Sequence, residues 1–134
     1  AYVMPHVRTA ILEAQSRAGI PGIEQIDVIE THDCFTTSEY MAIDHFGITA
    51  PGQSWKAVES GEIALGGKTP INPSGGLIGA GHPVGATGMY QIVEVVEQLR
   101  GQCGTTQVEG AKIGMAQNIG GSGATILTHI LKSG

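Results

Sequence analysis

Residues 72–88, with the sequence NPSGGLIGAGHPVGATG, constrain this chain more than any other stretch. Six glycines and two prolines surround one histidine, His82. Glycine lets backbone amides approach a ligand closely and adopt positive φ. The residues that follow have apolar side chains at helical spacing: Met89, Ile92, Val93, Val96 and Leu99. We therefore expect His82 in a glycine-rich loop where a helix begins, with Pro83 in the first turn of that helix.

The start of a helix suits the chemistry of His82. The free amides and partial positive charge there favour a bound anion and a neutral imidazole. A neutral imidazole can act as a base near pH 7. A lone histidine in a helix cap is more often structural, but the surrounding glycines make a functional role the better interpretation here.

Composition bounds the class of protein and its partners. The 134 residues suffice for one domain with its own core. The net charge of −5 leaves no basic surface for nucleic acid or for an anionic membrane, and no apolar run approaches the roughly 20 residues of a membrane span. Charged residues make up only 14% of the chain, against a typical value of about 25%, so we expect a homodimer or tetramer.

Cysteine usage and the opening residues give two further expectations. Cys34 and Cys103 are too few for a disulfide framework or a metal cluster, so we expect no metal and a reducing compartment. That compartment would be the cytoplasm, or the peroxisome if the source is a eukaryote. The opening AYVMP lacks an initiator methionine and leads into a helical pattern, so we expect a piece of a longer polypeptide.

The order of helical and strand patterns predicts an α/β fold with helices on the faces of a sheet. Helices are expected at 6–18, from about 36 to 46 after a capping box, and from about 85 to 100. Strands are expected at 26–30, 69–72, 111–117 and 124–131. The segment 48–67 is expected to be irregular, with one helical turn near 55–59.

Three unusual segments follow predicted strands: 32–34, 72–82 and 118–123. In α/β sheets the ligand crevice lies at the carboxyl ends of the strands. We therefore expect these segments to converge on one crevice.

Cys34 has two interpretations of equal weight. It could be a small buried core residue, as most free cysteines are. Beside His32 and Asp33 at the end of a strand, it could instead be a thiol activated by its neighbours. Asp33 and Glu30 fit structural hydrogen-bonding roles better than an acid–base pair.

Three motifs together resemble the thiolase family, whose members cleave or form 3-ketoacyl-CoA thioesters. Gly81-His82-Pro83 resembles the GHP signature of thiolases. The sequence HDCF at 32–35 resembles the variant motif of the sterol-carrier-protein-X type, in which it replaces the usual NEAF. Asn118-Ile119-Gly120 stands where most thiolases have Cys-x-Gly, and the same subfamily lacks that cysteine. The resemblance covers essentially the whole chain, residues 1–134, as a C-terminal thiolase domain.

The resemblance implies three catalytic side chains. His82 would activate the nucleophilic cysteine and donate to the first oxyanion hole. His32 would support that same oxyanion hole. Cys34 would be the second acid–base group, which takes or returns the proton at the α-carbon of the thioester. This Claisen chemistry needs a thiolate, a proton shuttle and donors for two oxyanions.

The resemblance implies four further site residues, one of which would act through its backbone amide. The amide of Gly120, close to Asn118, would contribute to the second oxyanion hole. Gly79 and Gly81 would line the substrate site. The substrates would be acyl-CoA and CoA, and no other cofactor is implied.

The resemblance also implies that part of the enzyme is absent. The nucleophilic cysteine of thiolases belongs to an N-terminal half that this sequence does not contain. The C-terminal half is expected to begin with the central strand of a mixed sheet, whereas here a helix comes first. We therefore expect a thiolase-like C-terminal half without its central strand, inactive without the N-terminal half.

Two other functions remain open. A thiolase-like retro-aldolase would shorten steroid side chains, as CoA thioesters, on the same fold. A non-catalytic scaffold or assembly subunit would keep the site residues without using them and would dock through residues 48–67.

Overall fold

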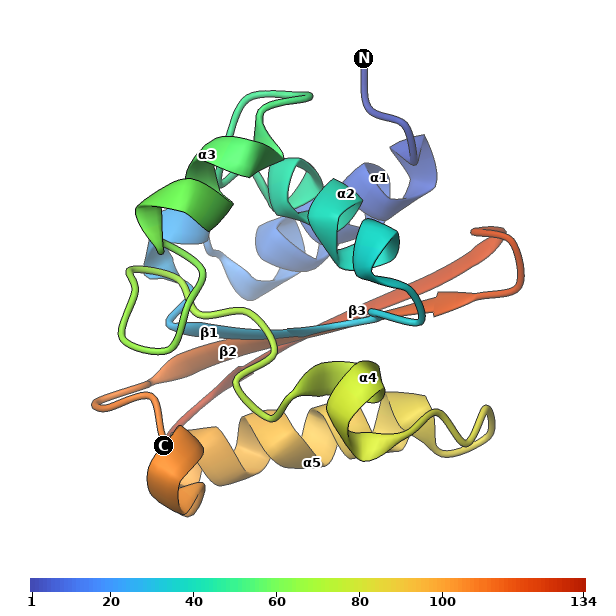
Figure 1. The fold of residues 1–134 in the computed structure, drawn as a ribbon. Coiled ribbons are helices and arrows are strands. Elements are labelled where there is room, and N and C mark those ends of the chain that lie inside the picture. Colours follow the sequence, from blue (N-terminus) through green and yellow to red (C-terminus); the bar gives the residue numbers. More distant parts are fainter.

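A three-stranded mixed sheet separates two layers of helices (Figure 1). The computed structural model describes all residues, 1–134. The strands β1 (Val28–Thr31), β2 (Ile113–Gly120) and β3 (Thr125–Lys132) lie in the order β1-β2-β3. β1 and β2 run parallel, whereas β2 and β3 are antiparallel. The predicted α/β fold with a mixed sheet is thereby confirmed.

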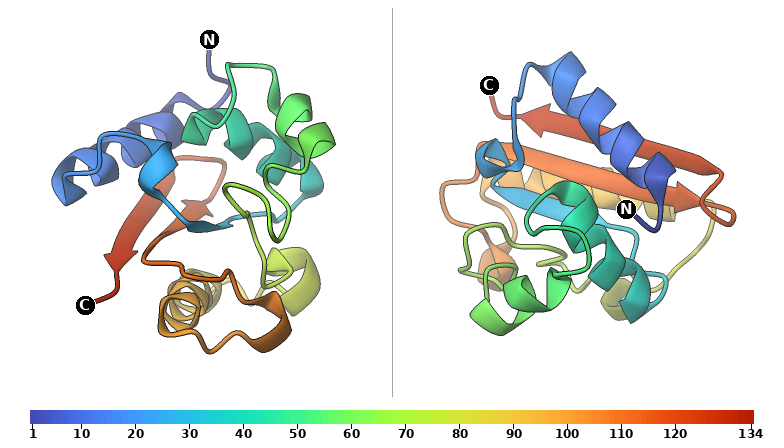
Figure 2. Two further views of the ribbon diagram at one scale, coloured as in Figure 1. Left: turned by 90° about the vertical axis from the view of Figure 1, so that its left-hand side faces the viewer. Right: turned by 90° about the horizontal axis from the view of Figure 1, so that it is seen from above.

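Helices cover both faces of the sheet (Figure 2). On one face lie α1 (Pro5–Ala18), α2 (Thr36–Phe46) and α3 (Ser54–Ser60), and on the other lie α4 (Gly76–Ala80) and α5 (Thr87–Arg100). Two short 3-10 turns, η1 (Ile23–Gln25) and η2 (Gly104–Thr106), precede β1 and β2. The three long helices confirm the sequence prediction, and the helical turn expected at 55–59 is α3. None of the helices combines the length and apolar composition needed to cross a bilayer.

The hydrophobic core fills the space between the sheet and the helices α1 and α2. Its largest members are side chains that the helical and strand periodicities place on facing surfaces: Val7, Ile11, Ile29, Ile43, Phe46 and Met115. Each such side chain stabilises the fold by about 1.5–3 kcal/mol through removal of apolar surface from water. This layer fixes β1 and β2 and so positions the strand ends.

The face of α5 that packs on the sheet is mostly polar, which differs from the expectation. Its buried residues are Thr87, Gln91, Val95 and Gln98. Met89 and Val93, which the helical spacing assigned to the apolar stripe, are 65% and 48% exposed. Met89 and Val93 therefore face away from the sheet, whereas Ile92, Val96 and Leu99 are half-buried.

Three expectations about the sheet are corrected. The segment 69–72 forms a single parallel bridge between Ile71 and Ile29 rather than a strand, because Asn72 (φ 50°) turns the chain away. β2 runs on to Gly120, so only the turn 121–124 joins it to β3. The strand expected to be missing would not lie in the centre of this sheet, because β1, β2 and β3 pair directly and leave no gap. A further strand can join only at an edge, and β3 forms an open edge of eight residues.

Close packing of α5 on β2 depends on Gly114. A Cβ atom at this position would lie 2.5 Å from Cγ1 of Val95 and 3.2 Å from Cγ1 of Val28. The helix can approach the sheet this closely only because residue 114 has no side chain.

Gly114→Ala should lower the free energy of unfolding by about 1–3 kcal/mol, because the new methyl group forces α5 away from the sheet. Urea unfolding measures this loss. Val95→Ala makes room for the methyl group, so the double variant should be more stable than the sum of the two single effects predicts. Strict additivity would contradict the proposed contact.

Candidate active site

Two imidazole rings, those of His32 and His82, meet beside the carboxyl end of β1. Their centroids are 5.0 Å apart and their planes are nearly perpendicular, at 84°. His32 follows directly after β1 and is only 6% exposed, whereas His82 lies between α4 and α5 and is exposed. The pairing of these two predicted site residues is a product of the tertiary fold.

Asn118, near the end of β2, joins this pair from the third predicted segment. Its Nδ2 lies 3.0 Å from Nδ1 of His32 and donates to Oε1 of Gln91 at 3.0 Å. Gln91 is fully buried on α5, and its Nε2 donates to the carbonyl oxygen of Gln117 at 3.2 Å. The expected convergence of the three segments is confirmed. Gln91 was not predicted, although a polar residue within a helical apolar pattern is the signal that could have drawn attention to it.

His82 is attached to α5 through a side chain rather than by lying in its first turn. Its Nδ1 is 2.6 Å from Oγ1 of Thr87, and this hydroxyl donates to the carbonyl oxygen of Pro83 at 3.1 Å. α5 begins at Thr87, so the expectation that Pro83 occupies the first turn is wrong. The glycines around Pro83 leave the backbone free to turn before the helix starts.

The environment of His32 favours its neutral form. Burial lowers the pKa of His32, and the neighbouring His82 lowers it further, while Asp33 acts in the opposite direction. A neutral imidazole keeps one N–H donor and one acceptor nitrogen. His32 can therefore donate one hydrogen bond to a substrate while it accepts another from the protein.

Cys34 is exposed, which excludes its interpretation as a buried core residue. Its Sγ lies 3.5 Å from Oγ of Ser38, in the first turns of α2. It is the second residue after His32, so the backbone holds it close to the imidazole pair. Its role as an acid–base group stays a prediction.

Asp33 attaches the glycine-rich loop to the end of β1. One carboxylate oxygen accepts from the amide of Leu77 at 2.6 Å, and the other accepts from the amide of Ile78 at 3.4 Å. Gly76 makes this contact possible, because a Cβ there would overlap the carboxylate and its φ is +61°. The resulting short helix α4 was not predicted, since its cap comes from a residue distant in sequence.

Asn72 and Glu39 form a second attachment of the loop. Oδ1 of Asn72 accepts from the amide of Thr31 at 2.7 Å, and its Nδ2 donates to Oε2 of Glu39 at 3.2 Å. No side chain caps the start of α2, so the predicted capping box is wrong. Glu39 instead links α2 to the loop.

Glu30 forms the third attachment, to Ser74. Its carboxylate accepts from the hydroxyl of Ser74 at 2.8 Å and from the amide of Ser74 at 3.3 Å. Burial raises the pKa of Glu30 to about 7, an increase that the hydrogen bonds from Ser74 partly oppose. The structural roles expected for Glu30 and Asp33 are confirmed by these contacts.

The three predicted backbone positions are found at the same end of the molecule. The amides of Gly79 and Gly81 donate to the carbonyl oxygens of Gly75 and Leu77, so neither N–H is free for a ligand. Gly120 is the last residue of β2, opposite Thr125 of β3. Contacts of these glycines with a substrate stay predictions.

Comparison with known proteins decides the family. The family model described as "Thiolase C-terminal domain-like" matches residues 2–133. This chain belongs to that family. The thiolase domain is 50% identical over 105 residues to an acetyl-CoA acetyltransferase of Methanothermobacter thermautotrophicus, a match that covers 78% of this chain and 27% of the relative. It is 44% identical over 121 residues to sterol carrier protein 2 of Rattus norvegicus, covering 90% of this chain and 22% of the relative.

A solved structure has the same fold. The chain described as "Ltp2-ChsH2(DUF35) aldolase" superposes with a TM-score of 0.82 at 22% identity, covering 97% of this domain and 32% of that chain. The predicted thiolase-like fold is therefore confirmed. The thiolase domain spans about a quarter of the length of the curated relatives that it matches.

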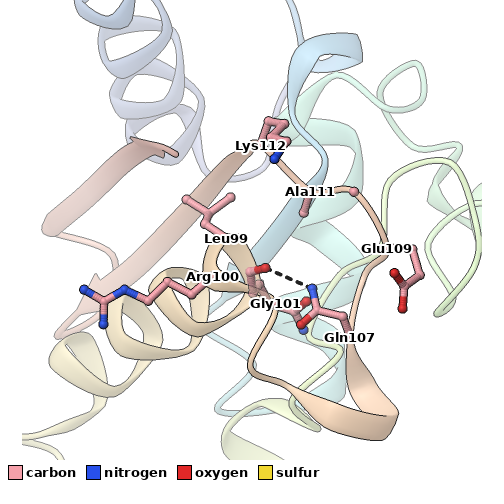
Figure 3. A pocket seen from close by; sticks show the side chains of 9 residues that line it. Leu99, Arg100, Gly101, Gln107, Glu109, Ala111 and Lys112 are labelled. Atoms are coloured by element: carbon pink, nitrogen blue, oxygen red, sulfur yellow. Dashed lines mark hydrogen bonds between the residues drawn. The ribbon is translucent and has the colours of Figure 1, made fainter. Parts of the chain in front are cut away.

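Two hollows lie at different ends of α5. One, of about 360 Å³, is lined by Gly85, Met89, Gln91, Asn118 and Leu127 among others, and it so includes the amide that contacts His32. The other lies at the C-terminal end of α5 (Figure 3), where Nε2 of Gln107 donates to the carbonyl oxygen of Gln98 at 2.9 Å. Of the two, only the first adjoins predicted site residues.

A cluster of possible metal ligands on the thiolase domain lies apart from the imidazole pair. Ligand atoms of Glu94, Glu97 and Cys103 lie within 4.8 Å of one another. Burial raises the pKa of Cys103, and the nearby carboxylates raise it further.

Glu30→Gln should change how the stability of the domain depends on pH. The carboxyl group of Glu30 ionises near pH 7 in the folded state but near its ordinary value of 4.5 when unfolded. The folded state therefore binds the proton more tightly, and Glu30 lowers the free energy of unfolding as pH rises from about 4.5 to 7. Glu30→Gln should abolish this part of the decline, on the order of 3 kcal/mol.

Urea unfolding at pH 5 and pH 7.5 measures the difference. Glu59→Gln, an exposed change on α3, is the matched control and should keep the wild-type dependence on pH. An equal dependence on pH in the wild type and Glu30→Gln would contradict the assignment.

Proposed function

We propose that this thiolase domain is the C-terminal catalytic half of an enzyme that cleaves or forms 3-ketoacyl-CoA by Claisen chemistry. The observation that carries the proposal is the perpendicular pair of His32 and His82 beside the carboxyl end of β1. Membership of the thiolase family and 50% identity to an acetyl-CoA acetyltransferase support it.

In cleavage, the thiolate of an N-terminal cysteine attacks the 3-keto carbon of the substrate. His82 takes the proton from that cysteine and, with His32, binds the resulting oxyanion. The bond between C2 and C3 then breaks, and the electron pair becomes the enolate of acetyl-CoA. Cys34 returns a proton to C2, while the amide of Gly120 beside Asn118 stabilises the enolate oxygen. Donors of this kind each contribute roughly 3–4 kcal/mol to stabilisation of the transition state.

In the second half of the reaction, the thiol of CoA attacks the acyl group on the cysteine, releases the shortened acyl-CoA and restores the thiol. Gly79 and Gly81 allow the substrate to approach the loop because they have no side chains. CoA acts as a substrate, and the residues described need no further cofactor.

The partner of this domain is an N-terminal thiolase half that supplies the cysteine. Two surfaces support this proposal: the open edge of β3 and the apolar side chains exposed on and just before α5, namely Val84, Met89 and Val93. Exposed apolar side chains grouped in this way are typical of an interface. The short length of the chain relative to its relatives also fits such a partner. Assembly as a dimer or tetramer, and location in the cytoplasm or peroxisome, stay predictions.

His82→Ala should lower the rate of acetoacetyl-CoA thiolysis by about 10²–10⁴-fold, because a positioned acid–base group is lost. Cys34→Ala should also lower it strongly. The assay uses the complete protein, with both thiolase halves, and follows the loss of free CoA. His6→Ala is the control, because His6 is exposed on α1 and should leave the rate unchanged.

Wild-type rates in both site variants would contradict these roles. Cleavage of a β-hydroxy thioester without consumption of free CoA would instead identify a retro-aldolase. A complete protein that turns over neither substrate would favour a scaffold.

A further inference from the structure

We propose that Gln91 is a positioning residue, which acts through Asn118 to hold His32 in the tautomer with its proton on Nε2. The consequence for catalysis rests on the proposed function, whereas the tautomer itself follows from hydrogen bonds within this chain. The hydrogen-bond relay, which we call the amide relay, consists of the carbonyl of Gln117, Gln91, Asn118 and His32.

The carbonyl of Gln117, the first member of the amide relay, fixes the direction of every hydrogen bond in it. The carbonyl oxygen of Gln117 can only accept, so the atom of Gln91 that lies 3.2 Å away must be the nitrogen. Oε1 of Gln91 therefore faces Asn118 and needs a donor, which the Nδ2 group supplies at 3.0 Å. The same NH₂ group has a second hydrogen and directs it to Nδ1 of His32 at 3.0 Å. Nδ1 must then be the unprotonated nitrogen, and the proton of the neutral ring lies on Nε2.

Burial keeps water from both ends of the amide relay. Gln91 and Gln117 are fully buried and His32 is almost so, whereas Asn118 between them is half-buried. Leaving one buried donor or acceptor without a partner costs about 1–3 kcal/mol. If the amide of either Gln91 or Asn118 were flipped, two donors or two acceptors would face each other in at least one of these contacts. The arrangement described is therefore strongly favoured.

His82 takes part in a second relay, with Thr87 and Pro83. The hydroxyl of Thr87 lies 3.1 Å from the carbonyl oxygen of Pro83 and 2.6 Å from Nδ1 of His82. Its single hydrogen can serve either contact, because the carbonyl oxygen also accepts from the amides of Ala86 and Thr87. The hydrogen bonds of the chain therefore fix the tautomer of His32 alone.

Both rings leave their Nε2 atom available to a substrate. Neither Nε2 has a hydrogen-bond partner within the chain, because both rings use Nδ1 for their contacts. Nε2 of His32, which carries the proton, can donate to an oxyanion. Its tautomer is fixed before substrate arrives, which is how a preorganised site avoids reorganisation during the reaction.

Neutron diffraction from deuterium-exchanged crystals of the complete protein tests the assignment directly. We expect deuterium on Nε2 and not on Nδ1 of His32. This measurement needs no variant and no turnover. Deuterium on Nδ1 alone of His32 would overturn the proposal, whatever the enzyme catalyses.

Variants then test the role of Gln91. Gln91→Met keeps the volume of the side chain but removes both of its hydrogen bonds, so deuterium should be shared between Nδ1 and Nε2 of His32. Thiolase kcat should fall about 10-fold or more with little change in KM, the size of effect seen when a partner that orients a histidine is lost. An unchanged tautomer together with unchanged kcat would overturn the role of Gln91.

Two further variants keep the test decisive if Gln91→Met fails to fold. Asn118→Asp replaces the donor by a carboxylate that only accepts, so deuterium should appear on Nδ1 of His32. Thr87→Val removes the partner of His82 and should leave the tautomer of His32 unchanged. Loss of the Nε2 tautomer of His32 in Thr87→Val would contradict the independence of the two relays. The expected tautomers in a protein without thiolase activity would uphold this proposal and contradict the proposed function.

Discussion

The carboxylate of Asp33 is the contact on which the site depends most, because it joins the end of β1 to the glycine-rich loop. The loop is rich in glycine, which carries a high entropic cost when it is ordered, and Leu77 is its one large side chain packed in the interior. Hydrogen bonds from the amides of Leu77 and Ile78 to a charged group contribute about 1.5–3 kcal/mol each, although the longer one should contribute less. Glu30 and Asn72 add attachments on either side. His82 acquires its position from a loop that the strand holds.

The packing of α5 is the second constraint. This helix presents Thr87, Gln91 and Gln98 to the sheet, and each makes hydrogen bonds there or in the adjoining loops. Buried amides are tolerated because their donors and acceptors have partners. The arrangement places polar groups behind the imidazole pair and leaves apolar side chains on the outside. A helix with one face buried against its own sheet and apolar side chains on the other face fits between two layers rather than at the surface of a monomer.

The position of the open edge follows from the same topology. Direct pairing of β1, β2 and β3 means that an added strand meets the sheet at β3, where α1 contributes nearby cover on one face. An unpaired strand of eight residues is a surface that natural proteins rarely leave bare. The sheet and α5 thus leave two adjacent surfaces for a neighbour, and Asn118, which contacts His32, lines the hollow between them.

Local patterns in the sequence predicted the alternation of helices and strands and the helix ends at glycine, and they include the motifs GHP and HDCF that mark the family. These features are local, because periodicity and turn residues act over a few positions. Periodicity defines which residues share a face of α5 but does not say which face meets the sheet, so the polar stripe with Gln91 was missed. The tertiary structure alone decided the contacts of Asp33, Glu30 and Asn72, whose partners lie 33–45 residues away in sequence. It also decided the tautomer of His32, because the direction of its hydrogen bond is set by the carbonyl of Gln117 at the far end of the amide relay.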